Sequence, residues 1–248
     1  MRYVPVLLLF LLVGLSSCGP SKTQLKEEAS VHYGLGVVHL NAGDIPEALK
    51  ELTTAVEKYP EDATYHNALG LAYFAREMNH DAIGHFKRAI ELKSDFSDAH
   101  TNLSAVYLQE GRWDDAISEA DEALANIFYK APELAYLNRG RAYYEKAEYK
   151  KAVEDFERAV KANENYALAY YNLGLAYIRT DRYGDAKKAL STLIRFIPNH
   201  IDGLYNLGLI YLKLKEPEQA KRAFSEVIRL APEGELARSS RGYIDLLK

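Results

Sequence analysis

Three histidines that recur at intervals of 34 residues could bind a metal ion. These are His32, His66 and His100. A zinc site needs its imidazole nitrogens within about 2.1 Å of the metal, whereas equivalent atoms of packed helices lie on the order of 8–10 Å apart or more. Later copies of the same position hold Tyr136, Tyr170 and Leu204. We therefore expect the histidines to pack in a core, and we expect neither a metal site nor a cofactor.

Catalytic chemistry has little support elsewhere in the chain. Carboxylates occur in adjacent pairs such as Glu27 and Glu28, but neighbouring residues of a helix point in different directions and do not form a dyad. The sequence has no phosphate-binding loop, nucleophile elbow or HExxH zinc motif. An enzyme that uses His100 or Cys18 is an alternative, which the lack of a convergent polar cluster disfavours. We expect no catalytic residue and a non-enzymatic protein.

The composition is that of a folded protein, and its charge argues against a dedicated nucleic-acid binder. The 248 residues are 48% hydrophobic and 27% charged, with a formal net charge of −4. Nucleic-acid binders are normally basic. Because the chain has one cysteine, an intramolecular disulfide is excluded.

The N-terminal segment has the pattern of an export signal. Arg2 is followed by an apolar run from Val4 to Leu15 and by two small residues, Ser16 and Ser17. A bilayer-spanning helix needs about 20 apolar residues, and this run is shorter. The order of a positive residue, a short apolar run and small residues predicts a cleaved signal peptide at residues 1–17.

The residues Leu15-Ser-Ser-Cys18 resemble the bacterial lipobox. The resemblance implies cleavage before Cys18 and attachment of lipid to this cysteine, the only non-protein group that we expect. Gly19 stands where an Asp often marks inner-membrane retention, which favours an outer-membrane, periplasm-facing anchor. Two or more acyl chains give stable anchoring without a spanning helix. The alternative is an ordinary secretory signal with a chance cysteine.

A repeated pattern fills the rest of the chain. A glycine or serine is followed three residues later by an aromatic residue or histidine and, nine residues further on, by an alanine. The first position holds Gly36, Gly70, Ser104, Gly140, Gly174 and Gly208. The last holds Ala48, Ala82, Ala116, Ala152, Ala186 and Ala220. Apolar residues at helical spacing on both sides of a polar break predict two helices per unit, and the small residues allow these helices to approach closely.

This pattern resembles the tetratricopeptide repeat (TPR), whose period is 34 residues. The resemblance implies an all-α, right-handed superhelical solenoid of stacked helix-turn-helix units. Six repeats are expected at residues 29–62, 63–96, 97–132, 133–166, 167–200 and 201–234. Two departures stand out. Repeat three has two extra residues and Ser104 in place of glycine, and repeat four has Arg139 where the others have leucine.

Both ends of the repeat array carry signals of termination. Residues 18–28 are expected to form a lipidated tether that leads into the first helix, and Ser21 with Gln24 fits a capping box. Residues 235–248 are expected to form a capping helix. Its predicted buried stripe is Leu236, Ser240, Tyr243 and Leu247.

The TPR resemblance also places a protein-binding groove on the first helix of each repeat. The expected groove residues are Tyr33, Val37, Asn67, Leu71, Thr101, Leu137, Arg141, Tyr171, Leu175, Tyr205 and Leu209. They are largely apolar and do not resemble the basic carboxylate clamp of chaperone-binding TPRs. Such a surface suits an amphipathic helix or an extended hydrophobic segment. The alternative is that these side chains pack on one another or on the last helix.

A lipobox followed by six TPRs resembles the pilotins of type IV pilus systems. The resemblance implies a scaffold that binds a secretin subunit and assists its localisation or assembly in the outer membrane, with no small-molecule substrate. A TPR lipoprotein that recruits peptidoglycan hydrolases, or one that serves outer-membrane protein assembly, is the alternative within the same structural class.

Overall fold

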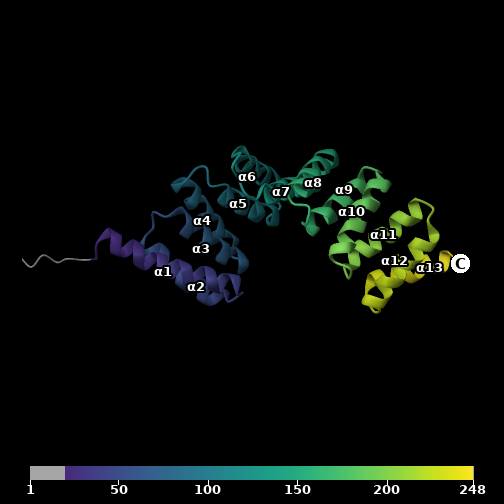
Figure 1. Cartoon of the computed structure of the whole chain (residues 1–248), viewed down its shortest axis with the longest axis horizontal. Helices are drawn as coiled ribbons and strands as arrows, with labels where there is room; N and C mark the ends of the chain where they lie inside the picture. The colour runs from purple at the N-terminus through teal and green to yellow at the C-terminus, as the bar shows by residue number, and fades with distance from the viewer. Residues whose placement is uncertain (1–19, 248) are drawn as a thin grey trace, which may run out of the picture. The chain divides into compact units, whose positions relative to one another are not determined.

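The protein is built from helical hairpins (Figure 1). The structure, a computed structural model, describes residues 20–247. Within this range there are thirteen α-helices and no strand, as the all-α prediction requires. The predictions for the signal segment and for Cys18 concern residues outside the described range.

Each predicted repeat contains two helices, and one more helix follows the sixth repeat. The first helices are α1 (Lys22–Asn41), α3 (Ala63–Ala75), α5 (Ser97–Gln109), α7 (Pro132–Glu145), α9 (Ala167–Arg179) and α11 (Ile201–Lys213). The second helices are α2 (Ile45–Lys58), α4 (Asn79–Leu92), α6 (Trp113–Ala125), α8 (Tyr149–Ala162), α10 (Tyr183–Phe196) and α12 (Pro217–Leu230). The last helix is α13 (Glu235–Leu246).

The chain divides into two compact units. The first ends at Pro60 and contains the α1–α2 hairpin, and the second begins at Glu61 and contains α3 to α13. Inside the second unit, the second helix of each hairpin packs on the first helix of the next hairpin: α4 on α5, α6 on α7, α8 on α9 and α10 on α11. One hairpin cannot bury both of its apolar faces, so this stacking creates the core.

The two helices of a hairpin meet where a glycine faces a large side chain. A Cβ atom added to Gly140 would lie 2.7 Å from the ring of Phe156, and one added to Gly70 would lie 2.7 Å from that of Phe86. The pairs Gly36–Leu52, Gly174–Leu190 and Gly208–Phe224 are equally close, at 2.5–2.6 Å. These large partners are fully buried. Any side chain at the glycine would push the helices apart.

Repeat three meets the same packing constraint with a small residue on each helix. Ser104 replaces the glycine, and the facing position holds Ala120 instead of a leucine or phenylalanine. Both residues are fully buried. The Ser104 hydroxyl donates a hydrogen bond to the Ala116 carbonyl oxygen at 2.7 Å, which satisfies its polar atom in the core. The departure noted in the sequence is therefore one half of a matched pair.

The turn inside every hairpin uses one residue in the left-handed region. Glycine supplies it in repeats one and three, where Gly43 and Gly111 have φ of 77° and 72°. The other four turns place Glu77, Ala147, Asp181 and Lys215 there, with φ of 56–60°. An L-residue pays roughly 1–2 kcal/mol for this conformation. A backbone bond closes each turn, such as Glu148 N–H to the Tyr143 carbonyl at 2.8 Å.

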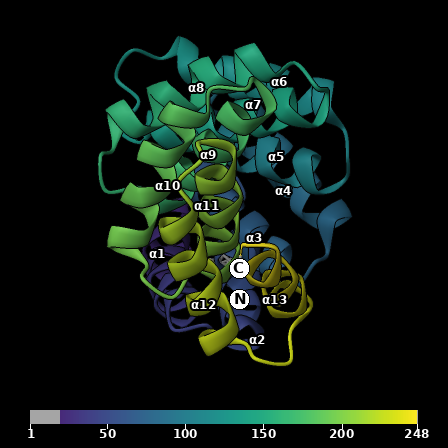
Figure 2. The same cartoon turned by 90° about the vertical axis from the view of Figure 1, so that its right-hand side faces the viewer.

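The structure tests the two signals expected at the ends of the repeat array, the Ser21 capping box and the C-terminal helix. The Ser21 capping box is confirmed, since the Ser21 amide donates to Gln24 Oε1 at 2.8 Å and the Gln24 amide to Ser21 Oγ at 3.2 Å. The last helix α13 lies beside α12, as Figure 2 shows. Its fully buried residues are Ala237 and Ser240. The predicted stripe is thus shifted by one residue at its start, because Leu236 is only half-buried.

Among the described residues, none of the helices combines the length and the apolar character required to cross a bilayer.

The glycine contact predicts opposite effects for two helical glycines. We expect Gly140→Ala to lower the free energy of unfolding by roughly 1–3 kcal/mol, because the added methyl group overpacks Phe156. Gly84 lies inside α4 with open space around its Cα, so Gly84→Ala should raise stability by up to about 1 kcal/mol through helix propensity. Urea denaturation of both variants measures the difference. An equal gain in both would show that the contact does not limit the fold.

Candidate protein-binding surface

The predicted groove residues lie on the first helices of the hairpins, and most are half-buried. In the first unit, Tyr33 and Val37 are half-buried on α1. In the second unit, α3, α5, α7 and α9 contact one another in succession. The half-buried members there are Asn67, Leu71, Tyr171, Leu175, Tyr205 and Leu209, and Arg141 is exposed.

Two predicted groove residues are not accessible. Thr101 and Leu137 are buried, each with only 3% of its surface exposed. The Thr101 hydroxyl bonds to the hydroxyl of Tyr129 at 3.0 Å, and the Thr101 carbonyl accepts a bond from Asn138 at 3.0 Å. Leu137 belongs to the hydrophobic cluster that contains Leu173. The Thr101 side chain thus contacts the loop of its own repeat, and Leu137 packs in a cluster that extends into the next repeats, so neither side chain is accessible to a partner in this structure.

Repeats two to four form a polar and closed part of this surface. Asn102 donates a hydrogen bond to the side-chain oxygen of Asn67 at 3.0 Å, which joins α5 to α3. Burial raises the pKa of Tyr129 to about 12, although its bond with Thr101 opposes the shift. The Tyr129 hydroxyl therefore stays neutral and holds its loop on α5. Polar contacts therefore interrupt the largely apolar surface in repeats two and three.

The accessible apolar surface lies toward the C-terminal end of the second unit. A hollow of about 420 Å³ is lined by Ile178 of α9, Tyr183 of α10, Leu209 and Leu212 of α11 and Tyr243 of α13, together with Asn206, Ile210 and Lys213. Half of the lining side chains are aliphatic, and the amide of Asn206, the ammonium of Lys213 and the two tyrosine hydroxyls supply polar groups. Small hydrophobic sites with few polar groups are the usual form of a binding pocket.

The last helix forms one wall of this hollow. The ring of Tyr243 stacks on Phe224 with centroids 5.1 Å apart and lies 6.4 Å from the ring of Tyr205. Burial raises the pKa of Tyr205, and the nearby Tyr243 adds to this effect. The alternative in which the last helix covers part of the groove therefore applies to Tyr205, while Leu209 stays at the hollow.

Two exposed leucines extend the apolar stripe beyond the predicted set. Leu134 on α7 is 39% exposed and Leu168 on α9 is 45% exposed. Each precedes the groove position of its own helix by three residues, as in Leu168 and Tyr171, so the two side chains share one helix face. The sequence contains a signal for these residues, because both occupy the second position of their repeats.

The three repeated histidines each pair with the second helix of their own hairpin. His32 Nδ1 lies 2.6 Å from Glu51 Oε2, and His100 Nδ1 lies 2.7 Å from Glu119 Oε2. In repeat two the facing residue is also a histidine, and His66 Nδ1 lies 3.1 Å from His85 Nδ1. In residues 20–247 no three potential ligands gather for a metal. The shared position is thus a polar contact within each hairpin.

These histidine contacts shift pKa values in opposite directions. Burial acts to lower the pKa of His100, but its bonds to Glu119 and to the Ser94 carbonyl outweigh burial, and the pKa is raised. Burial and the charge of His66 lower the pKa of His85. The His100 contact therefore stabilises the fold below about pH 6.5 and is lost as the pH rises through the raised value. The His85 contact contributes above that pH and is lost as the pH falls.

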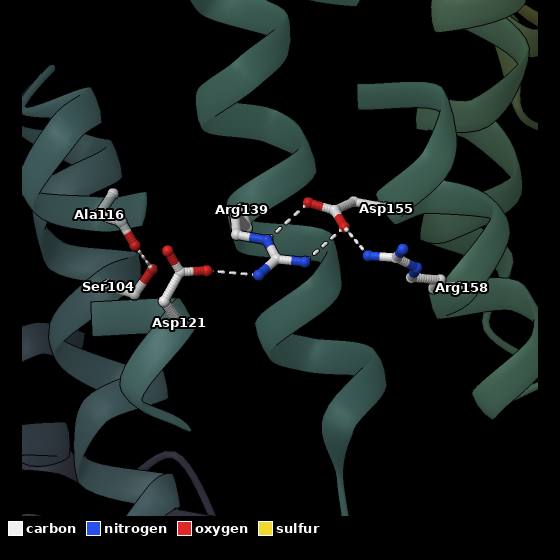
Figure 3. A network of polar contacts seen from close by, with 6 residues as sticks. All are labelled: Ser104, Ala116, Asp121, Arg139, Asp155 and Arg158. Atoms are coloured by element: carbon white, nitrogen blue, oxygen red, sulfur yellow. Dashed lines mark hydrogen bonds and ion pairs between the residues drawn. The ribbon is translucent and has the colours of Figure 1, made fainter. Parts of the chain in front are cut away.

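Repeat four has a buried ion network around Arg139, which stands where the other repeats have leucine (Figure 3). Arg139 of α7 donates two bonds of 2.7 Å to Asp155 of α8 and also bonds to Asp121 of α6. Arg158 approaches Asp155 at 3.4 Å. Burial acts to lower the pKa of Arg139, but the bonds to Asp155 and Asp121 raise it, so the guanidinium stays charged. The network ties three consecutive helices together.

The loop that leads from α6 to α7 contains the two extra residues of repeat three, and it exposes two large apolar side chains. Ile127 and Phe128 are both more than 80% exposed. Asn126 accepts a bond from the Phe128 amide at 3.0 Å and donates one to Ser97 at 3.1 Å. The two apolar side chains therefore project from a loop that is fixed at its base.

The geometry and the sequence together define the class of this protein. Models of the tetratricopeptide repeat match residues 33–95, 79–132, 140–181, 167–200 and 201–233. The chain belongs to the tetratricopeptide repeat family, and the predicted all-α TPR fold is confirmed. Proteins of this family are scaffolds that bind other proteins.

Two solved structures share the fold over most of the chain. The Pseudomonas aeruginosa protein pilF is 17% identical, with a TM-score of 0.81 over 88% of this chain and 98% of that chain. PilW, described as a widely conserved type IV pilus biogenesis factor, is 18% identical, with a TM-score of 0.78 over 85% of this chain and 97% of that chain. At these identities the likeness concerns the fold.

A curated relative matches a shorter region. Hsp70-Hsp90 organizing protein 1 of Glycine max is 30% identical over 105 residues, which are 39% of this chain and 18% of that protein. The match therefore spans less than a fifth of the relative's length.

The ion network predicts a strong coupling between two substitutions. Arg139→Leu should destabilise the protein by about 3–5 kcal/mol, because it leaves the buried Asp155 without its main partner. Adding Asp155→Ala recreates the pair Leu173 and Ala189 of repeat five and should recover most of that loss. A double-mutant cycle in urea measures the coupling. Simple addition of the two single effects would contradict the interpretation.

The histidine contact in repeat two predicts a change in acid stability. His85→Glu recreates the arrangement of His100 and Glu119, so the unfolding midpoint should fall less between pH 7.5 and pH 5.5 than in the parent. The reason is that the parent must protonate His85 against its lowered pKa. The matched change His80→Glu, at an exposed site of α4, should keep the parental pH dependence. An unchanged dependence in His85→Glu would exclude this contact as the cause.

Proposed function

We propose that this chain is a lipid-anchored, non-enzymatic scaffold that acts as a pilotin for a type IV pilus secretin. The observation that carries the proposal is the accessible apolar surface in repeats five and six, formed by Leu168 and by the hollow around Leu209. A secretin segment that is amphipathic or extended would bury apolar side chains there. Membership of a family of protein-binding scaffolds supports this role.

The similarity in fold supports the choice of partner. PilW is described as a type IV pilus biogenesis factor, and the fold shared with PilW and pilF extends over nearly their whole chains. A pilus protein that must be captured at a membrane fits a scaffold that exposes an apolar stripe.

The anchor is the second part of the proposal. The Leu15-Ser-Ser-Cys18 motif supports lipid attachment at Cys18, and lipid with two or more chains supplies stable membrane affinity. The first helix α1 begins at Lys22, so the repeats would follow the anchor after a short tether. In this proposal the protein faces the periplasm from the outer membrane and needs no cofactor apart from the lipid.

The groove model predicts that Leu168→Glu abolishes co-purification with the secretin from membranes. Leu168 is already 45% exposed, so a carboxylate there should leave the fold intact while opposing burial of the partner. The matched control is Leu246→Glu, an exposed leucine of α13 outside the stripe, which should co-purify like the parent. Circular dichroism confirms that both variants are folded.

A second arm separates binding from anchoring. Cys18→Ser should move the chain out of the membrane fraction and stop incorporation of labelled palmitate, while purified secretin is still bound. Unchanged co-purification by Leu168→Glu would refute the groove. Recovery of cell-wall hydrolases or barrel-assembly proteins in place of a secretin would favour the alternative TPR lipoprotein.

A further inference from the structure

The outer face of α1 carries an exposed apolar stripe. Val31, Leu35 and Val38 are 63%, 46% and 64% exposed. Their spacing of four and three residues puts them on one face of the helix. The hairpin partner α2 packs on the opposite face, where Ala29 and Gly36 are buried. Three large aliphatic side chains in one open stripe are unusual for a surface without a partner.

The same three positions are internal in the later repeats. In α5 they hold Ala99, Leu103 and Val106, which are all buried. Leu103 and Val106 belong to one hydrophobic cluster with Ala82 and Phe86 of the preceding helix α4. The corresponding buried residues of α7, α9 and α11 include Ala135, Ala142, Ala169, Leu173, Ala176, Leu207 and Ile210. The second helix of the preceding hairpin therefore covers this face in repeats three to six.

The residue types on α1 match an internal face of the array and differ from its opposite end. Leu35 and Val38 repeat the types found at Leu103 and Val106. At the other end, α13 presents exposed Arg238 and Arg241 to solvent, as expected for a terminal cap. The described chain provides α13 as a cap on α12, whereas the stripe on α1 stays open.

We propose that this open face of α1 binds an amphipathic helix of a partner protein. The partner helix takes the place that α4 takes on α5 and presents a small residue, a large apolar residue four positions later and a small residue three positions after that, as in Ala82, Phe86 and Ala89. This is a second protein-binding surface, separate from the stripe that contains Leu168.

The charges near the stripe define the direction of the partner helix. Glu27 lies one turn before Val31 and is exposed. The helices α4 and α5 are joined by a short connection and run antiparallel. A partner helix that takes the place of α4 would therefore have its C-terminal end beside this carboxylate. The second helices of this chain frequently carry a basic residue in their last turn, such as Lys161 of α8 and Arg195 of α10. A partner helix with a basic C-terminal turn fits best.

The test uses a helix that the chain itself provides. The probe is a fluorescent peptide of residues 79–93, which contains α4 (Asn79–Leu92) and the basic Lys93 that follows it. A lactam between the exposed Lys87 and Glu91 positions counters the low helicity of an isolated peptide of this length. Titration with the purified chain should show saturable binding by fluorescence anisotropy. The double variant Val31→Glu/Leu35→Glu should weaken binding at least tenfold. The control Phe128→Glu, at another exposed apolar site, should bind like the parent.

The outcomes distinguish this surface from other occupants. Absence of peptide binding, or equal binding by the double variant, overturns the proposal. A parental dimer that the double variant converts to a monomer in sedimentation assigns the face to a second copy and also overturns it. The proposal is also overturned if the Cys18→Ser chain binds phosphatidylethanolamine vesicles and the double variant does not, because the face would then bind a membrane. Because Leu168→Glu should bind the peptide normally, failure of the groove model does not affect the result.

Discussion

The structure depends on one contact inside each hairpin, where the absence of a side chain on one helix admits a large side chain from the other. A pair such as Gly140 and Phe156 fixes how closely the two helices approach. The next hairpin packs on the surface that these two helices form, so a change in their separation would also change the packing of the next hairpin. Repeat three uses Ser104 and Ala120, which are both fully buried, so a small residue on each helix also allows the two helices to pack.

A second contact beside the first varies along the chain and shapes the surface. One position of the second helix faces the first helix and holds Glu51, His85, Glu119, Asp155, Ala189 and Ala223 in repeats one to six. A histidine of the first helix contacts it in repeats one to three, and Arg139, three residues beyond the histidine position, contacts it in repeat four. The polar contacts tie side chains down and hold the helices in register. The alanine repeats are also the ones with the open apolar hollow. The open hollow thus lies in the two repeats that have an alanine in place of the polar contact.

The sequence predicts the fold well because a period of 34 residues reports the packing directly. The small residues at Gly140 and Ala152 mark the helix contacts, and Ser21 marks the start of α1. The binding surface is harder to predict. A position in the repeat says which way a side chain points, but Thr101 and Leu137 are buried by contacts with neighbouring repeats that this periodicity does not encode. The exposure of Leu168 likewise depends on the neighbours of α9, which only the assembled unit defines.

The left-handed turn residues have a practical consequence. Glu77, Ala147, Asp181 and Lys215 adopt a backbone conformation that their own side chains disfavour, so the packed helices on either side enforce the turn. All four side chains are exposed and belong to neither apolar stripe. They are therefore attachment points in four of the five hairpins of the second unit, where a fluorophore or spin label would report on the hairpins while both candidate protein-binding surfaces stay free.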